Sequence, residues 1–508
     1  MATPENFLQE INDGYSFKSE HVEIGCGMLD GNVVPGAAIS IPLKTMNRHG
    51  LIAGATGTGK TKTLQVIAEV LSNASVPVLL MDIKGDLSGI GAAGAVNDKI
   101  TARSAMINIP FNPTAFPVEF LTLSGEKGVR LRATVSEFGP ILLSKILGLN
   151  DTQGGLVAMI FKYCDDNKYP LLNLPDFIKV LQYVSNEGKD ELQKEYGQVS
   201  AASTGTILRK VVEMQQQGAD IFFGEPSFEI DDLMRISDDG RGMVNILRVT
   251  DMQEKPKLFS TFMLQMLAEL YATLPEVGDQ DKPKLVLFID EAHLLFDEAT
   301  SVLLQHIEMI IKLIRSKGVG VFFCTQNPQD IPASVLAQLG MKVQHALRAF
   351  TAADRDTIKK AAQNFPETSF YKTEDLLTKM GIGEAMITFL NEKGIPTPLV
   401  HTMLRPPESR MDILSDVEID AIVAKSKLAP KYNRVIDSES AYEILNDKIA
   451  TAAQKTKQET VPKNAPKEKS FFDNPTVKQV GRTAASIITR SLLGALGLGG
   501  KSNVKKWF

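Results

Sequence analysis

The chain has 508 residues, 44% of them hydrophobic and 23% charged, a globular composition with room for about two or three domains. Its net charge of −5 is uneven: residues 451–508 carry +8 (11 Lys and Arg, 3 Asp and Glu) and the rest −13, which argues against a wholly basic DNA-coating surface. Three scattered cysteines, a polar N-terminus and the lack of a long apolar run exclude a disulfide framework, a signal peptide and an integral membrane segment, so we expect a cytoplasmic protein.

The N-terminal part, residues 1–47, is predicted to be a short β segment, because Gly and Pro separate β-branched runs in it. From Gly50 the pattern changes. Residues 51–54 and 76–82 are apolar runs typical of buried strands, and the helix between them repeats apolar residues on one face. The stretch 50–82 is therefore a βαβ unit, which implies a parallel sheet with a right-handed crossover.

The middle of the chain is predicted to hold a mostly helical insertion, residues 113–235. After it, apolar strand candidates alternate with helices again, at 242–249, 284–290, 318–326, 342–350 and 383–390. This alternation predicts an α/β fold with a doubly wound, mainly parallel sheet. Its core would be formed by residues 48–112 and 236–410.

The C-terminal part divides into a helical segment, residues 411–450, and a basic region, residues 451–508. Residues 452–469 are rich in Lys, Gln and Pro and are predicted to be a flexible linker. Residues 483–500 are typical of an amphipathic helix followed by basic residues and Trp507. We favour docking of this tail on protein; contact with an anionic membrane or with DNA phosphates stays open.

A phosphate-binding loop is the strongest motif. The segment "GATGTGKT", residues 54–61, fits G-x-x-x-x-G-K-[ST] at every fixed position, after a predicted strand and before a predicted helix. Its glycines let backbone N–H groups point at phosphate oxygens, the lysine reaches the β- and γ-phosphates, and the threonine hydroxyl ligates Mg²⁺. The nucleotide-binding residues predicted are Gly54, Ala55, Thr56, Gly57, Thr58, Gly59, Lys60, Thr61 and Lys62.

A second motif, "LVLFIDEAH" (285–293), is an apolar strand that ends in two carboxylates. Asp290 is predicted to hold Mg²⁺ and Glu291 to act as the general base toward the attacking water. A glutamate in this position marks the subclass of phosphate-loop nucleoside triphosphatases whose sheet has an extra strand between the strands that carry the two motifs. The next strand ends at Gln326, which we interpret as a γ-phosphate sensor in preference to a strand-end cap. His293 is interpreted as an ordinary residue at a helix start.

Together these motifs resemble the HerA/FtsK group of ring-forming, DNA-pumping ATPases, whose fold is RecA-like. The chain is more narrowly similar to a bacterial family of HerA-like proteins of unknown role, which shares the helical insertion and the basic tail. The resemblance rests on motifs within about residues 47–405: "NRHGLIAGATGTGKT", "VLLMDIKGDLSG", "LVLFIDEAHLLF", "IRSKGVGVFFCTQNPQDIP", "ALRAF" and "KMGIGEAMIT".

The resemblance implies ATP and Mg²⁺ as cofactors and a homo-hexamer with its sites between subunits. It makes Arg315 an arginine finger and Arg48 a nucleotide contact; a basic residue at a helix C-terminus also suits the helix dipole, and Arg48 could instead be a solvated surface residue. It also suggests, more weakly, that Asp82 and Asp86 touch magnesium or water. Arg348 is a further candidate for an inter-subunit contact.

The chain departs from the resemblance in two respects. HerA-type motors carry an N-terminal β-barrel, in place of which residues 1–47 precede the loop, and the helical insertion is unlike a duplex-DNA pump core. No DNA-binding motif is readable, so a DNA substrate comes from resemblance. The expected function is ATP hydrolysis by a ring motor that acts on DNA; the alternative is an ATPase switch or a protein-translocating ring with a protein partner.

Overall fold

The computed structural model describes residues 3–459 except 254, 279, 297–300, 435 and 437. The chain forms two compact units. In the described part of the chain, residues 3–130 and 229–430 form the first, here called the sheet unit, and residues 131–228 and 431–459 form the second, the helical unit. The predicted linker and tail beyond residue 459 lie outside the described residues.

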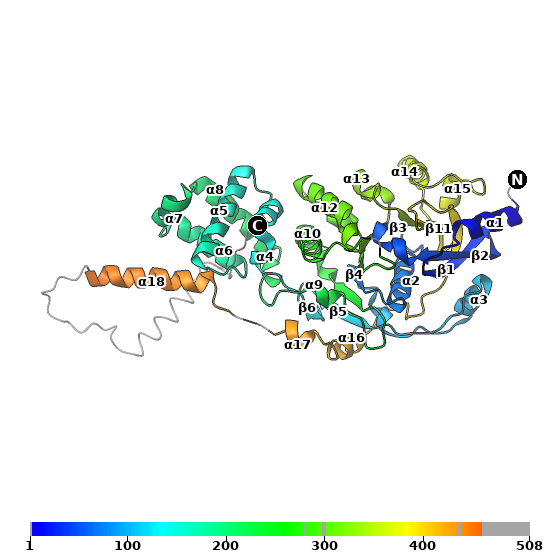
Figure 1. The fold of residues 1–508 in the computed structure, drawn as a ribbon, viewed down its shortest axis with the longest axis horizontal. Helices are drawn as coiled ribbons and strands as arrows, with labels where there is room; N and C mark the ends of the chain where they lie inside the picture. The colour runs from blue at the N-terminus through cyan, green and yellow to red at the C-terminus, as the bar shows by residue number, and fades with distance from the viewer. Residues whose placement is uncertain are drawn as a thin grey trace. The chain divides into compact units, whose positions relative to one another are not determined.

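Within the described residues, the sheet unit holds one twelve-stranded sheet in the order β2-β1-β12-β11-β10-β3-β9-β8-β4-β7-β5-β6 (Figure 1). The strands are β1 His21–Leu29, β2 Asn32–Pro42, β3 Gly50–Ala53, β4 Val78–Asp82, β5 Val118–Thr122, β6 Val129–Arg130, β7 Val244–Arg248, β8 Leu285–Ile289, β9 Val319–Thr325, β10 Met341–Gln344, β11 Glu384–Thr388 and β12 Val400–Leu404. Every pair from β10 to β6 is parallel, and β10-β11, β11-β12, β12-β1 and β1-β2 are antiparallel. This confirms the mainly parallel, doubly wound sheet.

The helices of the sheet unit connect and cover these strands. They are α1 Pro4–Gly14, α2 Lys60–Asn73, α3 Asp98–Ile107, α9 Ile230–Leu233, α10 Pro256–Thr273, α11 His293–Phe296, α12 Ser301–Ile314, α13 Ala333–Leu336, α14 Ala352–Ala362, α15 Thr373–Leu377 and α16 Asp416–Val423, with the 3₁₀ turns η1 Leu43–Arg48, η2 Ser88–Gly91, η4 Thr250–Met252, η5 Arg315–Lys317 and η6 Pro328–Asp330. α17, Ala429–Tyr432, lies where the chain passes from one unit to the other.

Helix α2 joins β3 to β4 and forms the βαβ unit that the sequence predicts. Its apolar face, Leu64, Ile67 and Leu71, is buried in the same core as sheet residues such as Ile52 and Leu80. Burial of each such side chain contributes about 1.5–3 kcal/mol, so the helix that follows the phosphate loop is firmly seated.

Two features differ from the sequence prediction: a helix within residues 1–47, and two strands within the stretch 113–235. α1 was not expected within residues 1–47. Thr3 caps its first turn by accepting from the backbone N–H of Asn6, Pro4 occupies the first position, and Phe7 and Ile11 bury one short face. In addition, β5 and β6 lie within the stretch 113–235 and extend the sheet, because β5 pairs with β7 along five residues.

The helical unit consists, in its described part, of α4 Val135–Ile146, α5 Asp151–Asn167, α6 Leu174–Ser185, α7 Lys189–Tyr196, α8 Ala201–Gln216, η3 Ala219–Ile221 and α18 Ala441–Glu459. Phe161 and Phe177 pack edge to face in its core. The chain returns to this unit through α18. This helix is fixed to α6 by a hydrogen bond of 2.9 Å, which the backbone N–H of Tyr442 donates to the Asp176 carboxylate. No helix in the described part of the chain is both long and apolar enough to span a membrane.

Candidate functional site

Four neighbouring parallel strands end at the same edge of the sheet and deliver the motif residues to it. In register, Ala53 of β3 lies beside Thr325 of β9, and Ile289 of β8 lies beside Met81 of β4. The phosphate loop, Gln326, the Asp290–Glu291 pair and the segment after Asp82 follow these ends directly. β9 is the extra strand between β3 and β8, and the edge is the place where open α/β sheets bind ligands.

Left-handed backbone shapes the phosphate loop. Gly54, Gly57 and Gly59 have φ of 153°, 77° and 117°, values that other residues adopt at a cost. A Cβ on Gly59 would come within 3.2 Å of the Gly383 nitrogen, whereas a Cβ on Gly57 would meet nothing within 4 Å. The open space over Gly57 is the kind of cradle that phosphate oxygens require.

Neighbouring strands hold this loop from outside. The N–H of Gly54 donates to Thr325 O at 3.3 Å, that of Ala55 to Ala346 O at 2.8 Å, and that of Gly383 to Thr58 O at 3.0 Å. The loop conformation therefore depends on β9 and on the segments after β10 and before β11.

Lys60 begins α2 and is buried, and its ammonium group donates to Ala55 O at 3.3 Å. Burial lowers the pKa of Lys60 and the nearby Lys84 lowers it further, while Glu291 and Asp290 oppose both. Thr61 is half-buried beside it. The side chain of Lys62 turns elsewhere, donating to Met411 O at 2.5 Å and to Gln65 Oε1 at 3.3 Å.

Asp290 and Glu291 are buried, with exposed fractions of 5% and 4%. Asp290 Oδ2 has no hydrogen-bond partner among the described residues. Burial, followed by the adjacent Glu291, raises the pKa of Asp290 to about 6. A buried carboxylate oxygen without a protein partner is the kind of ligand that suits Mg²⁺.

Glu291 has a left-handed φ of 44° and pairs with Lys84, which follows β4. The Glu291 carboxylate raises the pKa of Lys84, although burial acts against it. His293 Nδ1 lies 3.3 Å from Glu291 Oε2. The motif "VLLMDIKGDLSG" contains Lys84, but nothing in its local pattern marks the lysine as a partner of Glu291.

Asp82 and Asp86 differ in what occupies their oxygens. Asp82 Oδ1 accepts from the N–H groups of Gly85 at 2.8 Å and Asp86 at 3.1 Å, and Oδ2 accepts from Leu87 at 3.3 Å. Burial, then Asp86, raises the pKa of Asp82 to about 7. Asp82 thus shapes its own loop, whereas Asp86 Oδ1 is a buried atom without a partner in the described residues.

Gln326 is exposed at the end of β9, and the Thr56 hydroxyl donates to its Oε1 at 3.4 Å. The sensor candidate therefore contacts the phosphate loop from the end of the neighbouring strand. Arg348 is also exposed and follows β10 on the same edge, two residues after Ala346, which holds Ala55.

Arg48 and Arg315 lie at the opposite edge, where β3 and β9 begin. At about 3.3 Å per residue, the strands separate them from the phosphate loop of their own chain by roughly 20 Å. Arg315 is exposed and Arg48 half-buried. The structure thus does not bring these two residues together with the other candidates within one chain.

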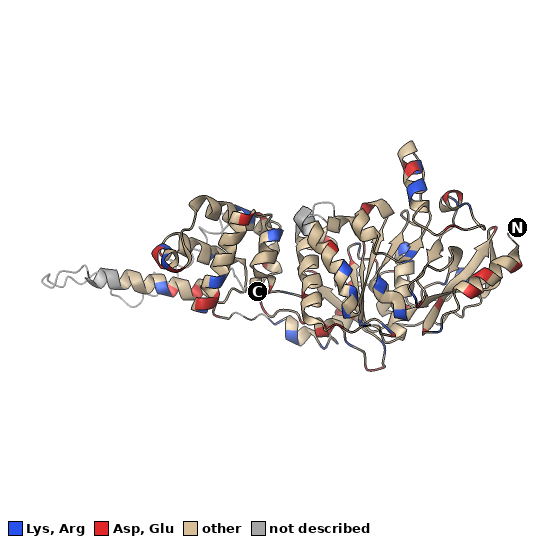
Figure 2. Cartoon of the chain, turned by 45° about the horizontal axis from the view of Figure 1, so that its top comes forward, with Lys and Arg blue, Asp and Glu red and all other residues tan. Residues whose placement is uncertain are grey.

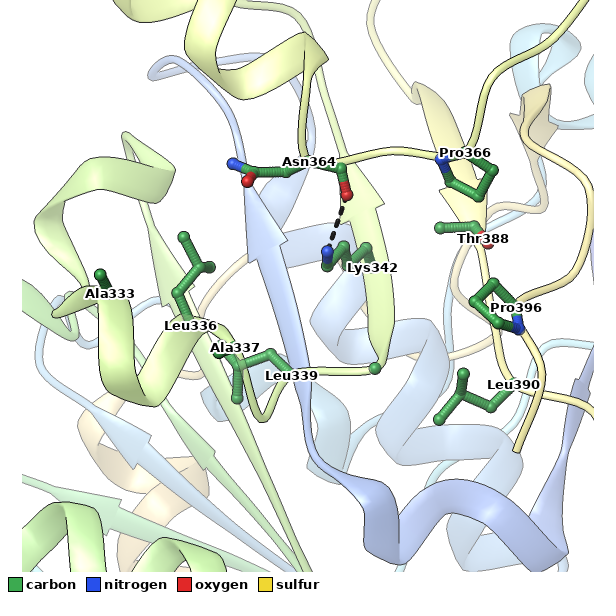
Figure 3. A pocket seen from close by; sticks show the side chains of 11 residues that line it. Ala333, Leu336, Ala337, Leu339, Lys342, Asn364, Pro366, Thr388, Leu390 and Pro396 are labelled. Atoms are coloured by element: carbon green, nitrogen blue, oxygen red, sulfur yellow. Dashed lines mark hydrogen bonds between the residues drawn. The ribbon is translucent and has the colours of Figure 1, made fainter. Parts of the chain in front are cut away.

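A pocket of about 620 Å³ lies near the start of β10 (Figure 3). Leu336 and Leu390 line it, and Lys342 donates to Asn364 O across it at 2.7 Å. Because β10 begins at the edge away from the phosphate loop, this pocket is separate from the nucleotide residues.

Comparison with known proteins agrees with this geometry. The sequence profile of the family described as "Helicase HerA-like C-terminal" matches residues 29–475. The "DNA double-strand break repair helicase HerA" of Sulfolobus acidocaldarius is 22% identical over 394 residues, 76% of this chain and 70% of the relative. The protein of the same name from Sulfurisphaera tokodaii is 23% identical over 354 residues, 69% and 64% of the two chains. This chain spans about two thirds of the length of the curated relatives it matches.

Solved structures resemble the chain more distantly. Plasmid coupling protein TrwB, in complex with ADP and Mg²⁺, is 15% identical with a TM-score of 0.48, covering 78% of this chain and 95% of that one. VirB4 of Thermoanaerobacter pseudethanolicus is 15% identical with a TM-score of 0.46, covering 75% and 96%.

Proposed function

This chain belongs to the helicase HerA-like C-terminal family, and from that premise we propose that it is an ATP-driven ring motor that moves on or remodels DNA. The chain is a P-loop nucleoside triphosphatase, with ATP and Mg²⁺ as its cofactors. The observation that carries the proposal is the convergence of Lys60, Glu291 and Gln326 at one sheet edge, around an open glycine cradle.

Each of these residues has its own role in ATP hydrolysis. Backbone N–H groups of the loop and the Lys60 ammonium group bind the β- and γ-phosphates, at the positive end of α2. Thr61 and Asp290 hold Mg²⁺, which when bound neutralises phosphate charge. Glu291 accepts a proton from the attacking water, and Gln326 orients that water between β9 and the loop.

A second subunit completes the site. Because Arg315 lies at the edge away from its own loop, a contact with phosphate is available to it only in a neighbouring chain. We infer a homo-hexamer in which Arg315 of one subunit stabilises the charge that develops on the γ-phosphate of the next. Arg48, at the same edge, contacts that neighbour's nucleotide, and Arg348 lies in the inter-subunit contact.

A DNA substrate is supported by the relatives, which are named as DNA double-strand break repair helicases. The test is the steady-state ATPase rate with and without linear duplex DNA, at low and moderate salt. A DNA motor gives strong stimulation that fades as salt rises, because phosphate contacts release counterions. Robust hydrolysis that is indifferent to DNA at every salt concentration contradicts a DNA substrate and leaves the ATPase assignment intact.

A protein-directed switch or translocating ring is the second candidate. The observation that favours it is charge, since residues 1–450 carry a net −13. Figure 2 shows Asp and Glu interspersed with Lys and Arg over the helices rather than a face of basic residues alone. We place either activity in the cytoplasm, where ATP and both kinds of polymer are available.

A further inference from the structure

Lys84 is a charged residue of the site for which the proposed reaction has no role. It lies between β4 and η2, and its ammonium group forms an ion pair with Glu291 Oε1. The Lys84 side chain is 35% exposed, whereas that of Glu291 is 6% exposed. The pair therefore joins a group that an entering ligand can reach to a carboxylate that the protein encloses.

The backbone fixes both partners. Lys84 lies within the loop whose N–H groups Asp82 binds, since Gly85, Asp86 and Leu87 all donate to that carboxylate. Glu291 is held in its left-handed conformation at the end of β8, and its carbonyl accepts from Leu294 at 2.9 Å. The ion pair is thus set by two constrained turns at adjacent strand ends.

Other charged groups surround the ion pair between Lys84 and Glu291. The ammonium groups of Lys60 and Lys84 are close enough to repel each other, and both are attracted to Asp290 and Glu291. A bound triphosphate adds several negative charges at the phosphate loop, beside Lys60. Those oxygens compete with Glu291 for Lys84, because a phosphate oxygen, like the carboxylate, accepts a charge-assisted hydrogen bond from the ammonium group.

On the premise of the proposed function, we propose that Lys84 exchanges partners when ATP binds. Its ammonium group leaves Glu291 and binds an oxygen of the γ-phosphate, which frees the Glu291 carboxylate to accept the proton of the attacking water. ADP has no γ-phosphate, so the ion pair persists with ADP. Lys84 is therefore the residue by which the site distinguishes ATP from ADP and keeps the base occupied until ATP is present.

The test compares the affinities of a non-hydrolysable ATP analogue and of ADP, each with Mg²⁺, by calorimetry on the full chain. Lys84→Met is expected to weaken binding of the analogue about tenfold, the worth of one charged hydrogen bond, and to change ADP binding less than twofold. Lys84→Arg, which keeps the charge, restores most of the difference. Lys44→Met is the matched control, because Lys44 pairs with Asp281 on the surface.

The same comparison on the Glu291→Gln chain separates two explanations. There no carboxylate is left unpaired when Lys84 is replaced, so a selective loss of the ATP analogue must come from the lysine's own contact, and we expect it to persist. An equal effect on both nucleotides, no effect, or a loss that disappears in the Glu291→Gln background overturns the exchange. Lys84→Gln serves if the methionine variant melts at a lower temperature than the wild type.

Failure of this inference is distinguishable from failure of the proposed function. If Glu291→Gln abolishes hydrolysis while Lys84→Met leaves the preference for the ATP analogue unchanged, the assigned base stands and the exchange is wrong. If Glu291→Gln hydrolyses ATP at the wild-type rate, the assigned base itself is wrong.

Discussion

The carboxylate of Glu69 accepts a hydrogen bond from the backbone N–H of Ser409 at 3.0 Å, across 340 residues of chain. The N–H of Glu408 donates to the same carboxylate at 2.8 Å. One turn and two turns earlier on α2, Gln65 donates to Arg410 O and Lys62 to Met411 O. The helix that begins at the phosphate loop is therefore bound along one side by the segment that follows β12.

Glu69 gives this contact a pH dependence. Burial raises the pKa of Glu69 to about 7, against the hydrogen bonds from Ser409 and Glu408. The pKa of Glu69 in the folded protein is higher than the pKa of a glutamate in the unfolded chain, which is about 4.3. Protonated Glu69 therefore stabilises the fold fully below about pH 4.3, and this stabilisation is lost as the pH rises through about 7. Asp82 and Asp290, with pKa values raised to about 7 and about 6, act in the same direction.

Glu69→Gln removes this titrating group. We compare the free energies of unfolding of variant and wild type at pH 5 and at pH 8. The deficit of the variant should be about 2–3 kcal/mol larger at pH 5, because only the wild type gains from protonation. Urea unfolding at the two pH values measures the difference. Glu213→Gln, on an exposed helix surface, is the control; a difference that is the same at both pH values would show that Glu69 does not titrate in this range.

Glu291→Gln is expected to lower the ATPase rate at least about a hundredfold while ATP remains bound. The amide keeps the shape of the side chain but cannot accept the proton of the attacking water. Coupled-enzyme assays measure turnover, and fluorescence of a labelled nucleotide measures binding. Lys60→Ala, in contrast, should lose both hydrolysis and most of the binding, so equal behaviour of the two variants would argue against their separate roles.

Gly59→Ala is expected to weaken nucleotide binding and to lower the melting temperature. Gly59 has a φ of 117°, and its Cβ would lie 3.2 Å from the Gly383 nitrogen, which is backbone. Placing alanine at this positive φ costs at least about 1–2 kcal/mol of folding free energy. Gly240→Ala is the control, because Gly240 also has a positive φ, 85°, but a Cβ there meets nothing within 4 Å. If both variants bind ATP like the wild type, the contact with Gly383 does not control the loop.

Mixing two inactive variants tests the arginine finger. Arg315→Ala and Lys60→Ala chains should each be inactive alone, and their mixture should regain activity. About a quarter of the interfaces then join an intact Arg315 to an intact Lys60. Lys312→Ala, an exposed residue of α12, should retain activity unmixed. A mixture as inactive as its components, in rings shown by light scattering to exchange subunits, contradicts the finger.

Features that depend on neighbours along the chain are predictable from the amino-acid sequence. A glycine-rich turn between an apolar run and an amphipathic helix sufficed to predict the phosphate loop and α2, and two carboxylates after the apolar run ending at Ile289 predicted the other motif. In parallel strands such ends meet at one edge, so the common position of Lys60, Asp290 and Gln326 was predictable from local pattern alone.

Which side chains pair across that edge, and which lie away from it, depends on how the whole chain folds. Lys84 and Glu291 are 207 positions apart, and their ion pair exists because β4 and β8 are adjacent in the sheet, a neighbour relation that no local period encodes. Arg315 lies at the other edge because it precedes β9 instead of following it. Strand order and strand direction are set by packing of the whole core, so contacts that depend on them are absent from the pattern of any single segment.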